Sequence, residues 1–66
     1  RESEPELVLA LTDESALVRA AAAWALCQLG SPGGLDAVRF RMQNEADLAT
    51  LHDMQESLLL VMPQKG

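Results

Sequence analysis

The stretch from Asp13 to Gly30 constrains the fold of this chain more than any other part of the sequence. It begins with polar residues that can cap a helix, continues with Ala and Leu at helical spacing, and closes on a Leu-Gly pair. We therefore expect a helix from about Ala16 to Leu29 with one strongly apolar face. On a helical wheel the expected core stripe contains Val18, Ala22, Ala25, Leu26 and Leu29.

The same stretch follows the pattern D-x4-V-R-x2-A-A-x-A-L-x2-L-G. The residues that match this pattern are Asp13, Val18, Arg19, Ala22, Ala23, Ala25, Leu26, Leu29 and Gly30. The pattern resembles the HEAT-like repeats of bilin lyases and of many bacterial scaffold proteins, and the resemblance implies an α-solenoid unit. It also implies a structural role for Asp13 and Arg19, as an ion pair or a hydrogen-bond ladder near the turn between two helices.

One further helix is expected before this stretch and another directly after it. The first runs over about residues 5–11, behind a Ser-x-x-Glu capping box at residues 3–6. The Ser-Pro-Gly-Gly segment of residues 31–34 is interpreted as a turn. The third helix is then expected to begin at Gly34 or Leu35 and to end at Gln43.

A fourth helix is predicted with Asn44 as its cap and with Asp47 favouring its N-terminal dipole. It ends before Pro63, which cannot continue a helix. The apolar stripe expected for this helix contains Leu48, Leu51, Gln55, Leu58, Leu59 and Met62.

These four helices predict an all-α fold, a single small domain over residues 1–66. Two helical hairpins stack as HEAT-like repeats, the first over residues 5–30 and the second over residues 34–62. The second lacks the Val-Arg pair and the Ala-rich spacing, as a degenerate terminal repeat would. The composition fits helices better than a β-sandwich, because 48% of the residues are apolar while the chain has one Trp, one Phe and no Tyr.

The charge balance bears on the partners of the chain. Ten acidic residues against five basic ones give a formal net charge of −5, which would repel a nucleic-acid backbone. No apolar run is long enough to cross a membrane. A single Cys cannot form an internal disulfide, so a reducing, cytoplasmic location is expected. The chain starts at Arg1 without a Met, and we interpret it as a piece of a longer protein.

Trp24 is the residue most expected to contact a partner. On the helical wheel it lies about 150° from the centre of the core stripe, on a second apolar face with Ala20, Ala23 and Cys27. This face either packs on a neighbouring repeat or anchors a protein partner, since Trp is enriched at binding hot spots. Cys27 lies near the C-terminal end of its helix, where a thiolate is disfavoured, so it is interpreted as a small, partly buried apolar residue.

The sequence predicts no catalytic residue, no cofactor and no metal site. His52 and Glu56 have i, i+4 spacing, but one His and one carboxylate are too few ligands for a zinc or iron centre. No nucleophile elbow or phosphate-binding glycine loop is present. Whether a longer parent protein is an enzyme stays open.

The leading hypothesis is a non-catalytic interaction or scaffold module, a terminal fragment of a HEAT-like repeat protein, that holds a protein partner or a second copy of itself. The first alternative is a fragment of a chromophore-handling protein that resembles the bilin lyases. The second alternative is a helical oligomerisation domain unrelated to HEAT repeats.

Overall fold

Four α-helices make up the regular structure of residues 4–61, the part of the chain that this computed structural model describes. They are α1 (Glu4–Ala10), α2 (Ala16–Leu29), α3 (Pro32–Asn44) and α4 (Leu48–Val61). The predicted all-α fold is confirmed for this part of the chain. The expected roles of Ser3, Met62 and Pro63 fall outside the described residues.

The ends of α2 are set by caps that the sequence supplies locally. The side-chain oxygen of Ser15 accepts a hydrogen bond from the backbone N–H of Val18 at 3.4 Å. Gly30 adopts the left-handed conformation with φ 70°, which a side chain would strain, and its N–H donates to the carbonyl of Leu26 at 3.1 Å. The helix therefore has the bounds that the sequence predicts.

The start of α3 differs from the prediction, because the Ser-Pro-Gly-Gly segment begins this helix. Ser31 is the N-cap and accepts from the N–H of Gly34 at 3.2 Å, and Pro32 occupies the first helical position, where its missing N–H is not needed. Gly33 and Gly34 suit this first turn because neighbouring groups lie close to the positions that a Cβ would take. A Cβ added at Gly33 would be 2.8 Å from a carboxylate oxygen of Glu4.

The cap of α4 is Asp47, and the expectation that Asn44 caps this helix is wrong. One carboxylate oxygen of Asp47 accepts from the N–H of Ala49 at 3.2 Å, and the other accepts from the hydroxyl of Thr50 at 3.1 Å. Asn44 lies in the last turn of α3, where its side-chain amide donates to the carbonyl of Phe40 at 3.0 Å. The carboxylate of Asp47 also interacts favourably with the dipole of α4, as the sequence predicts.

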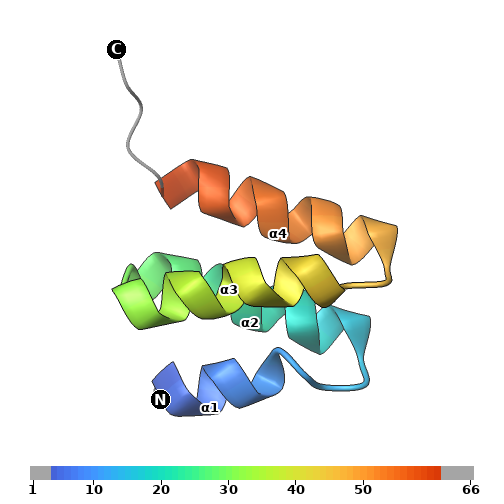
Figure 1. The fold of residues 1–66 in the computed structure, drawn as a ribbon, viewed down its shortest axis with the longest axis horizontal. Helices are drawn as coiled ribbons and strands as arrows, with labels where there is room; N and C mark the ends of the chain where they lie inside the picture. Colours follow the sequence, from blue (N-terminus) through green and yellow to red (C-terminus); the bar gives the residue numbers. More distant parts are fainter. Residues whose placement is uncertain (1–3, 62–66) are drawn as a thin grey trace.

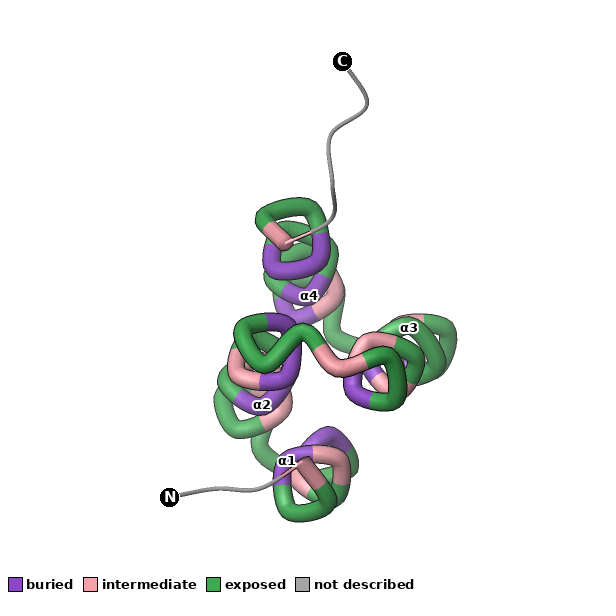
Figure 2. The backbone as a smooth tube through the Cα atoms, turned by 90° about the vertical axis from the view of Figure 1, so that its left-hand side faces the viewer, coloured by how far each residue is buried: buried purple, intermediate pink, exposed green. Residues whose placement is uncertain are grey.

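The helices form two hairpins, α1/α2 and α3/α4, that pack against each other. Helix α2 is central and packs on each of the other three helices. Figure 1 shows α2 between α1 and α4, with α3 in front of it. In the end-on view of Figure 2, α1, α3 and α4 surround α2 and leave one side of it exposed.

The core of the described residues draws on all four helices and on the turn after α1. It contains Leu7, Leu11, Ala22, Ala23, Leu26, Cys27, Val38, Met54 and Leu58. Helix α2 is rotated from its predicted orientation: Val18 and Leu29 are exposed, whereas Ala23 and Cys27 are buried. The cause is the central position of α2, which turns its buried sector towards α3 and α4 as well as α1.

Helix α4 is also rotated from its predicted orientation. Leu48 and Leu59, which the predicted stripe contained, are exposed, and Thr50, Met54 and Ser57 are buried instead. This helix packs on both α2 and α3. Small side chains at two of its buried positions, Thr50 and Ser57, let the helices approach closely.

Candidate functional site

The exposed side of α2 carries the candidate functional site, a groove between α2 and α4 with a volume of about 440 Å³. We call it the Trp24 groove. The residues that line it are Leu17, Ala20, Ala21 and Trp24 of α2 together with Asp53, Glu56, Ser57 and Leu60 of α4.

Large apolar side chains at this groove are open to solvent. Trp24 is 53% exposed, Leu17 is 83% exposed and Leu60 is 74% exposed. Leu17 and Trp24 lie seven residues apart, so they project from the same side of α2 about two helical turns from each other. Clustered apolar exposure of this kind is typical of contact surfaces.

Two of the four residues predicted for this face do not reach it. Trp24 and Ala20 line the groove, whereas Ala23 and Cys27 are buried in the core. They lie about 60 to 100° around the helix from Trp24, which is enough to turn them towards the neighbouring helices. Burial raises the pKa of the Cys27 thiol, so at neutral pH this residue stays in its unreactive form.

A polar cluster lies at the end of the molecule where both hairpin turns are found (Figure 1). Arg19 donates through Nε and Nη2 to the two carboxylate oxygens of Glu45, both at 2.8 Å. Its Nη1 donates to the backbone carbonyls of Asp13 at 2.8 Å and of Glu14 at 3.1 Å. The carboxylate of Asp13 instead accepts from the N–H of Ser15 at 2.8 Å. The ion-pair partner of Arg19 is therefore Glu45, and Asp13 contributes its carbonyl.

Glu45 is the central anion of this Arg19–Glu45 cluster, and its side chain is 0% exposed. It also accepts from Nε of Arg41 at 3.2 Å and from the N–H of Asp47 at 3.0 Å. The hydrogen bond from Arg19 is the main cause that lowers the pKa of Glu45 to about 2. The sequence reasoning missed this residue, because a Glu in a turn is ordinarily solvated.

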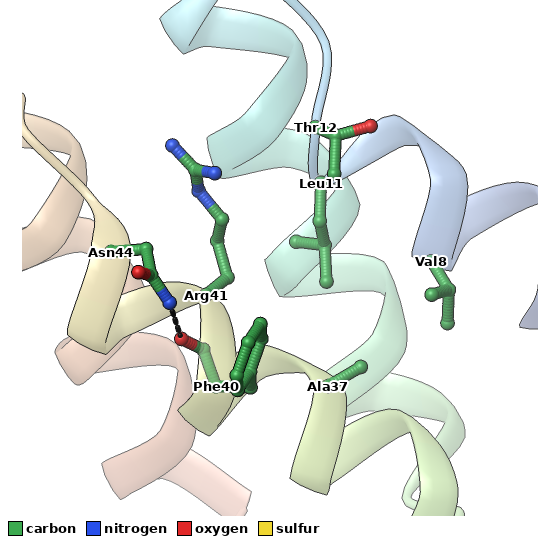
Figure 3. Close-up of a pocket in the computed structure, with 7 residues that line it drawn as sticks. All are labelled: Val8, Leu11, Thr12, Ala37, Phe40, Arg41 and Asn44. Carbon is green, nitrogen blue, oxygen red and sulfur yellow. Dashed lines mark hydrogen bonds between the residues drawn. The ribbon is translucent and has the colours of Figure 1, made fainter.

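A second groove lies on the opposite side, between α1 and α3, and has a volume of about 450 Å³. Figure 3 shows Val8 and Leu11 facing Ala37 and Phe40 across it. The amide of Asn44 is bonded to the carbonyl of Phe40. The guanidinium of Arg41, the cation that lines this groove, is already bonded to Glu45. The polar groups here serve the fold, which makes this α1/α3 groove the weaker candidate.

The His52–Glu56 pair lies beside the Trp24 groove, which Glu56 also lines. His52 and Glu56 lie 3.7 Å apart on the surface of α4, and both are exposed. Within residues 4–61, no three His, Cys, Asp or Glu side chains gather in a group that could hold a metal ion. None of the helices in the same range combines the length and the hydrophobicity that a membrane span requires.

Comparison with known proteins supports the predicted repeat. The epoxyqueuosine reductase of Bacillus anthracis is 36% identical to this chain over 62 residues, which cover 92% of this chain and 16% of the reductase. No solved structure matches the chain. Residues 5–31 match the HEAT repeat model. This match is to the general repeat and does not identify the bilin-lyase type. Helices α1 and α2, with the turn between them, are therefore a HEAT-like repeat.

Proposed function

We propose that this chain is a non-catalytic, cytoplasmic protein-interaction module of a HEAT-like repeat protein, with the Trp24 groove as its contact surface. The observation that carries the proposal is the exposure of Trp24 beside Leu17 and Leu60. Covering apolar surface stabilises an assembly by roughly 25 cal/mol per Å² removed from water. A half-exposed indole between two exposed leucines is therefore well placed to anchor a partner.

A second candidate follows from the similarity to epoxyqueuosine reductase, which extends over 92% of this chain. In this proposal the chain is a helical segment of a larger protein similar to that reductase. The Trp24 groove would then contact another part of the same polypeptide. The segment itself would have no catalytic role.

The other two hypotheses have less support from the described residues. A chromophore-handling role rests on the repeat alone, and a repeat shared by proteins of many functions is weak evidence for any one of them. The match of residues 5–31 to the repeat model argues against an oligomerisation domain unrelated to HEAT repeats. Association of two copies remains compatible with the groove.

A photo-cross-linking amino acid placed at Leu17 in the intact natural protein tests the contact surface. Leu17 lines the Trp24 groove, and Leu9, a large exposed apolar residue of α1 that lines neither groove, provides the matched control. We expect a defined cross-linked product from position 17 that disappears in a Trp24→Ala background, and none from position 9.

Sequencing the cross-linked peptides separates the candidates. A peptide from the same polypeptide supports the reductase-like arrangement, and one from another protein supports the interaction module. Equal products from positions 9 and 17, or no product from position 17, would refute the Trp24 groove as a contact surface.

A further inference from the structure

The charged residues that line the Trp24 groove are all negative. Two of its lining residues, Asp53 and Glu56, are acidic, and none is basic. Both are exposed, and Glu56 also lies 3.7 Å from His52. The basic residues of the described chain lie elsewhere: Arg19 is bonded to Glu45, and the other two are on α3. With a net charge of −5 for the chain, the groove favours a cationic partner and repels an anionic one.

The shape of the groove fits a helix. Its α2 wall is formed by residues 17, 20, 21 and 24, and its α4 wall by residues 53, 56, 57 and 60. The first and last residues of each wall are thus seven positions apart, about two helical turns or roughly 10 Å. This length equals the i to i+7 spacing of the apolar anchors that an amphipathic helix places in a groove.

The distribution of side-chain size supports the same occupant. Ala20, Ala21 and Ser57 are small and allow a helix backbone to approach, while Trp24 and Leu60 are large and exposed. An incoming apolar stripe would cover these two residues. Its flanking Lys or Arg side chains would reach the acidic residues of α4, and a Lys or Arg over the indole face would gain a cation–π contact.

We infer that the occupant of the Trp24 groove is a basic amphipathic helix of a protein partner. The inference rests on the proposed function, which it narrows to one class of ligand. The apolar stripe of the partner packs on Leu17, Trp24 and Leu60, and its basic flank faces Asp53 and Glu56.

Two synthetic helical peptides with identical leucine stripes test the inference. One carries Lys at all polar positions and the other carries Glu. Emission from Trp24 reports binding directly, because this is the single Trp of the chain and the peptides contain none. We expect the Leu/Lys peptide to give a saturable blue shift that weakens with added salt. The Leu/Glu peptide should bind at least about tenfold more weakly.

Variants of the chain, titrated by calorimetry, locate the binding. Trp24→Ala should lower the affinity for the Leu/Lys peptide by about thirtyfold, the equivalent of losing one hot-spot residue. The double variant Asp53→Asn/Glu56→Gln should strongly reduce the preference for Lys over Glu. Phe40→Ala removes an exposed aromatic side chain from the α1/α3 groove and should leave the affinity unchanged. Circular dichroism confirms that each variant keeps its helix content.

The outcomes separate this inference from the proposed function. Equal binding of both peptides overturns the basic partner, while cross-linking at position 17 can still support a contact surface. If neither peptide binds but position 17 cross-links, the partner is not a basic helix. A blue shift that appears without peptide and disappears on dilution places a second copy in the groove and also overturns the inference. Equal losses in Phe40→Ala and Trp24→Ala would put the peptide outside the Trp24 groove.

Discussion

Arg19 and Trp24 are five residues apart on α2, yet the side chain of Arg19 is bonded within the fold whereas that of Trp24 is half exposed to solvent. Each nitrogen of the Arg19 guanidinium donates to an oxygen of the chain itself. Among the described residues, no buried side-chain nitrogen or oxygen lacks a hydrogen-bond partner. The bonding capacity of the Arg19–Glu45 cluster is therefore used within the fold.

The Trp24 groove shows the contrary arrangement. Its indole and its two leucines are more than half exposed. The Arg19–Glu45 cluster fastens one hairpin to the other, while we propose that the Trp24 groove makes contacts outside these helices. Substitutions at the cluster should therefore change the free energy of unfolding strongly, and substitutions at the groove should change mainly binding.

The largest expected effect on stability comes from Glu45→Ala. This change leaves the nearly buried guanidinium of Arg19 without its carboxylate and cuts the link between the two hairpin turns. We expect the free energy of unfolding to fall by about 3 kcal/mol, as when one partner of a buried ion pair is removed. Urea unfolding followed by circular dichroism measures the loss.

Asp36→Ala is the matched control for Glu45→Ala, because it removes a carboxylate that pairs with Arg39 at 3.4 Å on the surface. An exposed pair of this kind contributes about 0–1 kcal/mol. Equal losses in the two variants would mean that Glu45 has no special structural role.

Acid should weaken the same cluster in a defined pH range. The pKa of Glu45 is lowered from 4.5 to about 2, chiefly by the hydrogen bond from Arg19. Between these values the unfolded chain binds a proton that the folded chain does not, so stability falls as the pH falls. The contribution of Glu45 is complete above about pH 5 and disappears as the pH falls to about 2.

The pH dependence can be assigned by comparing the wild type with Glu45→Gln. The difference between their free energies of unfolding should be largest near neutral pH and should shrink in acid. A difference that stays constant over this range would contradict the pKa assigned to Glu45.

A smaller loss of stability is expected from overpacking α2. Ala22 is buried in the core, so Ala22→Leu should cost about 1–3 kcal/mol. Ala20 is partly buried at the floor of the Trp24 groove, where an added isobutyl group has room, so Ala20→Leu should cost less than about 1 kcal/mol. Thermal melts of the two variants measure these losses, and the melting temperature of Ala22→Leu should fall further than that of Ala20→Leu. Equal shifts would show that the orientation of α2 described above is wrong.

The sequence was sufficient to locate α2, because both of its ends are set by neighbouring residues. Ser15 and Gly30 lie beside the helix that they cap, so local rules apply. The rotation of the helix was not predictable in the same way. Residues 20–23 are all Ala and leave little contrast between faces, and the position of the buried sector depends on three packing partners.

The two candidate regions differ in the same respect. Trp24 could be assigned to the surface from its position on the wheel alone. Ala23 and Cys27 were misplaced, because an apolar face predicted from a wheel does not show which part of it another helix covers. Glu45 was missed because its importance arises from Arg19, 26 residues away in sequence. The family resemblance implied a bonding role for Arg19, but it pointed to Asp13 in the turn before α2 and not to Glu45 in the turn after α3.

The smallest expected effect on the stability of the isolated chain comes from Trp24→Ala. Half of the indole is buried, which argues for some loss, but the Ala that replaces it has the highest helix propensity. We therefore expect a net change of about 1 kcal/mol or less in the free energy of unfolding. The binding of a partner should instead weaken by about 2 kcal/mol or more.

Fluorescence of the wild type decides whether this division between stability and binding is correct. In the dilute chain, Trp24 should emit as a partly hydrated indole that a soluble quencher reaches, and partner binding should shift the emission to the blue and reduce quenching. Leu60→Ala, at the other wall of the groove, should weaken binding with a similarly small cost in stability. If the emission of the dilute chain is already blue and protected from quencher, Trp24 belongs to the core. The proposed difference between the Arg19–Glu45 cluster and the Trp24 groove would then be wrong, because both regions would stabilise the fold.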